Sequence, residues 1–343
     1  MKNPTISDVA ARAGVSKSTV SAVINNRNTL KETTRLNVVR AIEELNYRPS
    51  PAARRGFRSV SGKSISLIVK EMQNPYYAEI FTGVQEVAYE QGFLVSVSSS
   101  EGRFDVEQRL VEQATEQQLD GLIVAPILND ETDLSHIFEM KRSKIPFVLL
   151  EDVRGIRANL IDVDNVRASA DAVRHLIRHG HSRIVHLAGP TYSQHSEERA
   201  EGVRRAFSES HLIFDHRVVL SAGDSLDDGY RAGLEFFSQL SREDRPTAVT
   251  CYNDLVALGL LRALRELEIR VPEDVSVVGF DDLPVLAYFP LALTTVHVPK
   301  YEMGRRAAEL LIQQIDSRAE PTFEKQHLQA SLIVRDSTRE LVS

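Results

Sequence analysis

Short apolar runs alternate with amphipathic stretches along the chain from residue 64 onward. The runs have the length of buried strands, and the stretches repeat apolar residues at helical spacing. This alternation predicts parallel sheets that are covered by helices on both faces. The expected strands span residues 64–70, 93–99, 121–126, 146–151, 159–165, 183–189, 218–223, 248–254, 275–282, 294–299 and 330–337. The expected helices span residues 74–91, 105–118, 133–143, 166–179, 196–209, 226–239, 255–268 and 300–316.

These elements fall into two series, and the second series begins near residues 159–165. Two series predict two similar α/β lobes, each of the doubly wound type. Three segments are expected to pass between the lobes, at residues 150–165, at residues 281–296 and at the last strand. In such sheets a ligand binds beyond the carboxyl ends of the strands, so a cleft between the lobes is the expected ligand site.

The first 45 residues have a purely helical pattern instead. Apolar residues recur at helical spacing in residues 6–13 and again in residues 17–24. Thr5 and Ser16 precede these stretches and can cap them, while Gly14 interrupts the pattern between them. Two short helices joined by a tight glycine-containing turn form a helix-turn-helix. The simpler alternative is a helical hairpin with a purely structural role.

A third helix is expected directly after the helix-turn-helix. Thr29 and Glu32 have the spacing of a capping box. The apolar positions that would cover the core of a three-helix unit are Leu36, Val39, Ala41, Ile42 and Leu45.

Charge is distributed unevenly along the chain. The net charge is −7, yet residues 1–60 carry eleven Lys and Arg against four Asp and Glu, a balance of +7. The remaining residues therefore carry −14. A small basic unit joined to a large acidic one is expected when one end of a protein binds nucleic acid. The start of the second helix carries Lys17, Ser18 and Ser21, which suit base edges and phosphates.

The bulk composition indicates an intracellular globular protein. The chain has 343 residues, which is long enough for more than one folding unit. Cys251 is the single cysteine, so no disulfide can form within the chain. The N-terminus has no apolar run of signal-peptide length, and no stretch has the length of a membrane span. We expect a cytoplasmic protein that does not bind a membrane.

The segments "TISDVAARAGVSKSTVSAVIN" and "AIEELNYRPSPAAR" resemble the lactose-repressor (LacI/GalR) family of bacterial transcription regulators. The resemblance implies that the second helix lies in the major groove and that Lys17 and Ser18 help to choose the base sequence. Contacts with the phosphate backbone are implied for Thr5, Ser16, Thr19, Ser21 and Asn25. Ala22 departs from the arginine of many members, because alanine cannot make the bidentate contact with guanine.

Residues 49–62 form a basic, proline-containing linker. The resemblance implies a hinge helix that folds on DNA and inserts an apolar side chain between base pairs of the minor groove. Tyr47, Ala53 and Arg54 match the family pattern in and before this segment. Gly56 stands where the family usually has a leucine wedge, and we expect the neighbouring Phe57 to replace it. The expected domains are residues 1–48 (helix-turn-helix), 49–62 (hinge) and 63–343 (effector binding and dimerisation).

Polar side chains follow several of the expected strands and are candidates for the cleft. Carboxylates, an amide and an arginine suit sugar hydroxyls, and tyrosines can stack on a ring. Each candidate also has a structural explanation. Asn74 and Pro75 can form only a helix start, Glu151 can pair with Arg199, and Asp282 can be a loop residue. For Asp254, capping of the following helix is the favoured role.

Nine further motifs, among them "NPYYAEIFTGVQEVA", "ERAEGVRRAF" and "VPEDVSVVGFDDLP", match the effector domain of the same family in order. That domain is similar to periplasmic sugar-binding proteins. Carried over position by position, the implied effector contacts are Tyr76, Tyr77, Glu151, Arg199, Asn253 and Asp281. Val298 stands where some sugar-responsive members have a polar residue, so the identity of the effector cannot be copied. The first helix of this domain and the surface near "EQRLVEQATEQQ" are expected to build a dimer interface.

We therefore expect an α-helical DNA-binding domain joined to a two-lobed, periplasmic-binding-protein-like α/β domain. The expected function is that of a homodimeric repressor that reads a near-palindromic double-stranded operator and is switched by a small effector, a sugar or sugar derivative. A transport-type sugar-binding protein and a sugar-modifying enzyme on the same scaffold are the alternatives.

Enzyme chemistry has little support in the sequence. It contains no GxSxG motif, Walker loop or Rossmann fingerprint. His175 and His179 are spaced i, i+4 as a metal pair would be, but a solvated helix face is the favoured interpretation. Cys251 lies in a buried strand pattern and suits the core better than a nucleophile role. We expect no enzyme, no cofactor and no metal.

Overall fold

The computed structural model describes residues 4–24, 30–45, 47, 63–128, 134–215, 217–317 and 323–341. The chain separates into two compact units, Met1–Gly62 and Lys63–Ser343. Within the described part of the chain, no helix is both long and apolar enough to cross a membrane.

The first unit contains three helices around a small apolar core. They are α1 (Ile6–Ala13), α2 (Lys17–Ile24) and α3 (Glu32–Glu44). Thr5 and Asp8 form a capping box at the start of α1, and Gly14 ends that helix in the left-handed conformation with φ 67°. The buried residues Val9, Ala10, Val20, Val38, Ala41 and Tyr47 form the core. The predicted helix-turn-helix is therefore present.

Two details of the third helix differ from the expectation. The N-cap of α3 is Lys31, whereas the expected cap, Thr29, lies outside the described residues. Leu36 and Val39 are exposed, because Val38 and Ala41 face the core instead. A helix of mixed composition offers two possible apolar faces, and packing against α1 and α2 selects one of them.

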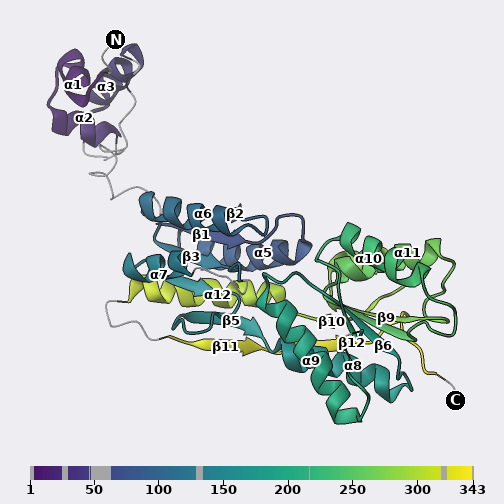
Figure 1. Cartoon of the computed structure of the whole chain (residues 1–343). Helices are drawn as coiled ribbons and strands as arrows, with labels where there is room; N and C mark the ends of the chain where they lie inside the picture. The colour runs from purple at the N-terminus through teal and green to yellow at the C-terminus, as the bar shows by residue number, and fades with distance from the viewer. Residues whose placement is uncertain are drawn as a thin grey trace. The chain divides into compact units, whose positions relative to one another are not determined.

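The second unit has two lobes, each built on a six-stranded sheet (Figure 1). The sheet of the N-terminal lobe has the strand order β11-β5-β4-β3-β1-β2, and all its neighbouring strands are parallel. Its strands are β1 (Lys63–Val69), β2 (Phe93–Ser99), β3 (Gly121–Val124), β4 (Phe147–Leu149), β5 (Asn159–Val163) and β11 (Lys325–Leu328). Its helices are α5 (Pro75–Glu90), α6 (Phe104–Glu116), α7 (Ser135–Arg142) and α12 (Lys300–Asp316).

Side chains of the N-terminal sheet alternate between two apolar cores. Leu67 and Ile123 pack with residues of α5 and α12, whereas their neighbours Ile68 and Leu122 pack with residues of α6 and α7. Both faces are covered, which explains why the strands read as continuous apolar runs. The helices α5 and α12 cross closely at Gly83 and Gly304, where a Cβ atom would meet backbone of the other helix at 2.1 Å and 2.0 Å.

The sheet of the C-terminal lobe has the strand order β12-β10-β9-β8-β6-β7, in which only the β10–β12 pair is antiparallel. Its strands are β6 (Ile184–Ala188), β7 (Val219–Ser221), β8 (Ala248–Cys251), β9 (Ser276–Asp281), β10 (Thr294–His297) and β12 (Ser331–Ile333). Its helices are α8 (Asn165–Arg178), α9 (Gln194–Ser210), α10 (Leu226–Ser238), α11 (Asp254–Glu266) and the 3₁₀ helix Pro284–Tyr288. Figure 1 shows α8 and α9 on one face of this sheet and α10 and α11 on the other.

The division of strands between the lobes corrects the sequence prediction. The strand β5, which was expected to begin the second series, belongs to the N-terminal sheet, where it pairs with β4 and β11. The second crossing follows β10, beyond the predicted residues 281–296, because β10 still pairs with β9. The strand β11, an additional element of the N-terminal sheet, lies in a segment without an apolar run.

Candidate functional site

The start of α2 presents a polar surface. Ser16, Lys17 and Ser18 are exposed, and Thr19 and Ser21 are half-buried. The Ser16 hydroxyl accepts a hydrogen bond of 3.1 Å from the backbone N–H of Thr19, which caps the helix as expected. Thr5 is exposed at the start of α1. The predicted contacts of these residues with DNA are compatible with their exposure and stay predictions.

The other predicted DNA contacts are placed differently. Tyr47 is buried in the core of the three-helix unit, with 7% of its surface exposed. In this structure Tyr47 therefore packs in the apolar core. Asn25, Ala53, Arg54 and Phe57, together with Gly56, lie outside the described residues.

A cavity lies between the two lobes at the carboxyl ends of the strands. Five of the six predicted effector residues line it, namely Tyr76, Tyr77, Arg199, Asn253 and Asp281. The room left between the lining side chains is about 20 Å³. That is enough for about one water molecule. A ring-shaped ligand therefore needs more room than the cavity of this structure leaves.

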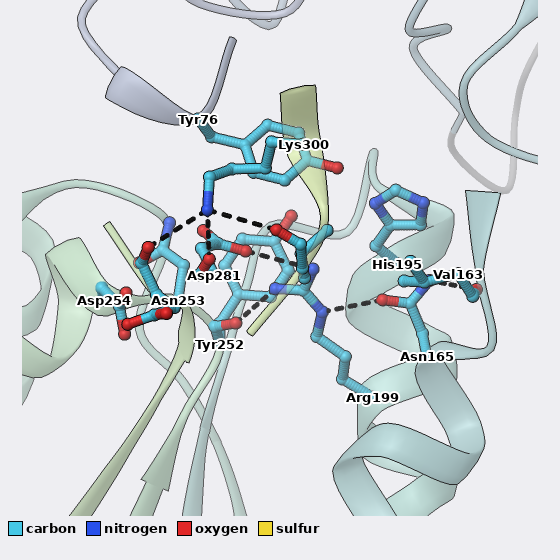
Figure 2. A network of polar contacts seen from close by, with 12 residues as sticks. Tyr76, Val163, Asn165, His195, Arg199, Tyr252, Asn253, Asp254, Asp281 and Lys300 are labelled. Atoms are coloured by element: carbon cyan, nitrogen blue, oxygen red, sulfur yellow. Dashed lines mark hydrogen bonds and ion pairs between the residues drawn. The ribbon is translucent and has the colours of Figure 1, made fainter. Parts of the chain in front are cut away.

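Arg199 is buried beside this cavity and is held by several groups (Figure 2). Its Nε donates to the side-chain oxygen of Asn165 at 3.1 Å, and its Nη1 donates to the carbonyl oxygen of Tyr252 at 2.5 Å. The guanidinium carbon lies 3.7 Å from the ring centroid of Phe280. Its Nη2 lies 3.6 Å from the Asp281 carboxylate, close enough for an ion pair. The planar guanidinium is therefore fixed in one orientation.

Asp281 stands at the end of β9 with a positive φ of 112°. Its Oδ1 is buried and has no hydrogen-bond partner among the described residues. Burial raises the pKa of Asp281 to about 6, and the charges of Arg199 and Lys300 only partly oppose that rise. The fully buried Lys300 donates to the carbonyl oxygens of Asp281, at 2.5 Å, and Asp282, at 3.1 Å (Figure 2). Lys300 thus holds the strained corner that presents the Asp281 carboxylate.

Glu151 is fully buried but lies behind the cavity lining. Its carboxylate pairs with Lys70 and accepts a hydrogen bond of 3.2 Å from the backbone N–H of Gln194. Burial alone would raise the pKa of Glu151, yet the charges of His195 and Lys70 outweigh it and lower that pKa. The predicted alternative, an ion pair between Glu151 and Arg199, is replaced by the pair with Lys70.

The helix cap expected at Asp254 is supplied by its neighbour Asn253, which also lines the cavity. Asn253 caps α11, since its side-chain oxygen accepts from the backbone N–H of Val256 at 2.8 Å. Asp254 is the first residue of that helix and is completely buried. It accepts hydrogen bonds from the backbone N–H of Leu283, at 2.8 Å, and from the hydroxyl of Thr295, at 2.6 Å. Asp254 therefore ties α11 to the segment after β9, and capping is not its role.

The cavity has aromatic walls. Tyr76 and Tyr77 follow the helix cap Asn74 and Pro75, and their rings meet edge to face with centroids 5.1 Å apart. Tyr252 and Tyr192 line the cavity from the C-terminal lobe. Such rings can pack against a flat or ring-shaped ligand.

Comparisons with known proteins match both units. Residues 5–50 match the model of the bacterial regulatory proteins of the lacI family, and residues 173–338 match a periplasmic binding protein-like domain. The HTH-type transcriptional repressor PurR of Vibrio vulnificus (strain CMCP6) is 32% identical over 341 residues, which cover 98% of this chain and 99% of that protein. The chain belongs to the lacI family. PurR of Haemophilus influenzae (strain PittEE) is 33% identical over 342 residues, covering 98% and 99% of the two chains.

Solved structures of transcription regulators agree with this chain over 82% to 98% of its length. The transcriptional regulator CelR–cellobiose complex has a TM-score of 0.71 and 31% identity, covering 97% of this chain and 99% of that one. The lac repressor dimer bound to operator and the anti-inducer ONPF has a TM-score of 0.74 and 26% identity, covering 98% and 100%. A regulator from Enterococcus faecium with bound ribose has a TM-score of 0.72 and 26% identity, covering 82% and 100%. This lacI-family protein is a DNA-binding transcriptional repressor with an effector-binding domain.

Several cavity-lining residues of this lacI-family protein escaped the sequence analysis. They are Lys70, Glu71, Tyr192, His195, Asp224 and Tyr252. Lys70 and Tyr252 directly follow β1 and β8, so the strand-end rule that found Asn253 could have found both. Tyr192 and Asp224 lie in loops whose positions depend on packing of the whole C-terminal lobe.

One group of side chains in this lacI-family protein could hold a metal ion. Ligand atoms of Asp162, His195 and Glu198 lie within 4.8 Å of one another. Their existing contacts explain the arrangement, since His195 pairs with Asp162 and Glu198 accepts from Asn165 at 3.1 Å.

The predicted pair His175 and His179 and the cysteine have packing roles. His175 is buried, so the expected solvated helix face is wrong for it. The rings of His175 and His179 lie 4.2 Å apart, and His175 contacts the Thr338 hydroxyl at 3.3 Å. Burial, with the nearby His179, lowers the pKa of His175 to about 4. Cys251 is buried in β8, and burial raises the pKa of its thiol.

Proposed function

We propose that this repressor is switched by a small carbohydrate-like effector that binds between the two lobes. The observation that carries the proposal is the cavity in which side chains from both lobes meet. The predicted effector residues Tyr76, Tyr77, Arg199, Asn253 and Asp281 line it, and Glu151 supports it through Lys70. Three of the similar structures contain cellobiose or ribose, which supports a sugar-like ligand.

The lobes provide the means of switching. In this structure contacts across the cleft hold the lobes together, including Lys70 with the Ser193 hydroxyl at 3.2 Å and the backbone N–H of Leu128 with the Tyr192 carbonyl at 2.7 Å. An effector that enters the cavity must break some of these contacts and make others. If DNA binding favours one arrangement of the lobes, effector and operator affect each other's affinity by the same factor.

Operator recognition would fall to the exposed start of α2. Lys17 and Ser18 would read base edges, while Thr5, Ser16, Thr19, Ser21 and Asn25 would hold the phosphate backbone. Ala53, Arg54 and Phe57 would contact DNA from the hinge segment, whereas Tyr47 would act from the core of the three-helix unit, where it is packed. The expected domain limits are 1–48, 49–62 and 63–343. Two copies related by a twofold axis would read a near-palindromic operator in the cytoplasm.

The deciding experiment joins DNA binding to effector binding. The operator is first selected from random duplexes with the purified full-length protein. A panel of sugars is then screened by thermal shift, in which a ligand at 100 times its dissociation constant adds about 2.7 kcal/mol of stability. Each bound sugar is finally titrated into the protein–operator complex.

We expect at least one bound sugar to change operator affinity by about 5- to 150-fold. Lys17→Ala should weaken operator binding, whereas Lys31→Ala, at an exposed lysine outside α2, serves as the control. A set of cleft-bound sugars that all leave operator affinity unchanged would refute the switch.

A further inference from the structure

Carboxylates from both lobes line the effector cavity. Glu71 follows β1 in the N-terminal lobe, Asp224 follows β7 in the C-terminal lobe, and Asp281 ends β9. A buried or half-buried carboxylate is costly unless a cation or hydrogen-bond donors face it. The surroundings of these three groups therefore indicate what the cavity is built to receive.

The cationic groups beside the cavity are already engaged by this chain. Lys70 pairs with Glu151, and His195 lies between Asp162 and Glu151. Arg199 donates to Asn165 and to the Tyr252 carbonyl and faces Asp281 from 3.6 Å. The cations are thus already paired with groups of this chain. The three carboxylates would repel a negatively charged ligand.

Asp281 gives the most direct indication of a ligand. Its side chain is 4% exposed, it lines the cavity, and its Oδ1 has no hydrogen-bond partner among the described residues. Arg199 supplies only a 3.6 Å ion-pair contact there. A buried acceptor without a donor loses the stabilisation that a hydrogen bond would supply. A ligand O–H or N–H would satisfy it.

Glu71 and Asp224 form a second acidic position, made from opposite lobes. The donors they have are neutral groups, since Asn74 donates to Glu71 at 2.8 Å and Tyr192 donates to Asp224 at 2.7 Å. Burial, with the charge of Asp224 adding to it, raises the pKa of Glu71 to about 7. Both carboxylates line the same cavity, so their negative charges repel each other. A cation between them would remove the repulsion and join the lobes.

We propose that the effector is an amino sugar, whose ammonium group lies between Glu71 and Asp224 and whose ring hydroxyl donates to Asp281. This inference rests on the proposed function, because it specifies the ligand of the same cleft. The tyrosine rings of Tyr76, Tyr192 and Tyr252 provide the surfaces for the sugar ring, and an aromatic face also attracts an ammonium group. Sugar phosphates and sugar acids are disfavoured by the same carboxylates.

The test uses matched probes with the full-length protein. Glucosamine, galactosamine and mannosamine are compared with their N-acetyl forms, with glucose, galactose and mannose, and with the hexose 6-phosphates. Isothermal titration calorimetry measures each affinity at pH 7.5. At least one amine should bind about tenfold or more tightly than its N-acetyl form and its parent hexose, since a charge-assisted hydrogen bond is lost in both.

Charge-neutral variants then locate the amine. Glu71→Gln and Asp224→Asn keep the size of each side chain and should reduce the preference for the amine over the parent hexose about tenfold or more. Glu90→Gln and Asp227→Asn, at exposed acidic residues outside the cavity, are the matched controls and should leave the preference unchanged. Melting curves of all four variants confirm that they are folded.

The failure of the amino-sugar inference and the failure of the proposed switch give different results. If a neutral or phosphorylated sugar binds tightest, or if none of the three amines binds, the inference is wrong. If such a neutral sugar also shifts operator affinity, the proposed switch stands without it. If an amine binds with the expected preference but leaves operator affinity unchanged, the ligand class is right and the proposed switch fails.

Discussion

The Nε2 atom of His195 lies 3.0 Å from a carboxylate oxygen of Asp162, and this contact joins the C-terminal lobe to the N-terminal lobe. The other ring nitrogen of His195 lies 3.5 Å from Glu151. One histidine of α9 is thus enclosed by two buried carboxylates of the facing lobe. A proton on this histidine strengthens the contact between the lobes, so the contact depends on pH.

Replacing His195 by glutamine should make the stability of the effector domain less dependent on pH. Burial alone would lower the pKa of His195, but the charges of Asp162 and Glu151 outweigh it and raise the pKa above its usual 6.5. The stabilisation by the charged histidine is therefore complete below about pH 6.5 and is lost as the pH rises through the folded-state pKa. Urea unfolding at pH 6 should show a loss of about 3 kcal/mol in His195→Gln.

That loss should shrink as the pH is raised from 6 toward 9. The exposed His327 of β11 is the control, because His327→Gln makes the same substitution at a histidine outside the contact between the lobes. A loss of equal size at both pH values would show that the histidine acts through packing rather than through its charge.

Arg199→Lys should weaken effector binding although it keeps the positive charge. Lysine cannot reach Asn165, the Tyr252 carbonyl and Asp281 together, because it lacks the planar fork of the guanidinium. We expect the affinity of a bound effector to fall by about 10- to 100-fold. Calorimetric titration measures this, with Arg205→Lys on the exposed face of the same helix as the control. Equal affinities of the two variants would exclude Arg199 from the effector site.

Lys300→Met should destabilise the effector domain. The ammonium group of Lys300 holds the carbonyl oxygens of Asp281 and Asp282, which both have positive φ angles, and lies 3.3 Å from Glu79. Methionine keeps the volume but donates no hydrogen bond to the two carbonyl oxygens and carries no charge to face Glu79. Urea unfolding should show a loss of about 3 kcal/mol. Lys325→Met, which breaks the exposed pair with Asp152, should cost less than about 1 kcal/mol.

Phe57→Ala should reduce operator affinity and DNA bending if Phe57 is the apolar wedge of the hinge. The prediction rests on the sequence alone, in which Gly56 offers no side chain to insert. We expect operator affinity to fall about tenfold, because DNA that the wedge no longer bends loses the protein contacts that the bend allows. Gel-shift assays with circularly permuted operator fragments measure both quantities. Gly56→Leu in the Phe57→Ala background should restore them, and normal bending by Phe57→Ala alone would contradict the assignment.

The sequence predicted those elements whose signals are local. The caps Thr5 and Ser16 and the helix stop at Gly14 define α1 and α2 within one turn of chain each, so the helix-turn-helix could be predicted. The alternation of strands and helices likewise predicted both lobes. The assignment of β5 to a lobe failed because it depends on pairing with β11, which lies about 160 residues away in the sequence.

Local signals in the sequence also led to part of the cavity lining, but not to all of it. The ends of apolar strands led to Asn253 and Asp281, because the carboxyl edge of a parallel sheet is a local feature. The helix-cap pattern gave the wrong role to Asp254, whose partners Leu283 and Thr295 are supplied by distant segments. Glu71 and Asp224 carry no signal of their own, since only the meeting of the two lobes makes them neighbours of one cavity.

The position of α12 and β11 in the N-terminal lobe has a consequence for synthesis of the protein on the ribosome. The three-helix unit has its whole core once Tyr47 has emerged. The first strand of the N-terminal lobe follows soon after. That lobe nevertheless lacks Met303 and Leu311 of its core, and also its last strand, until residue 328 has been translated. The C-terminal lobe in turn waits for β12. A nascent chain therefore carries the complete core of its helix-turn-helix unit long before either lobe of the effector domain is complete.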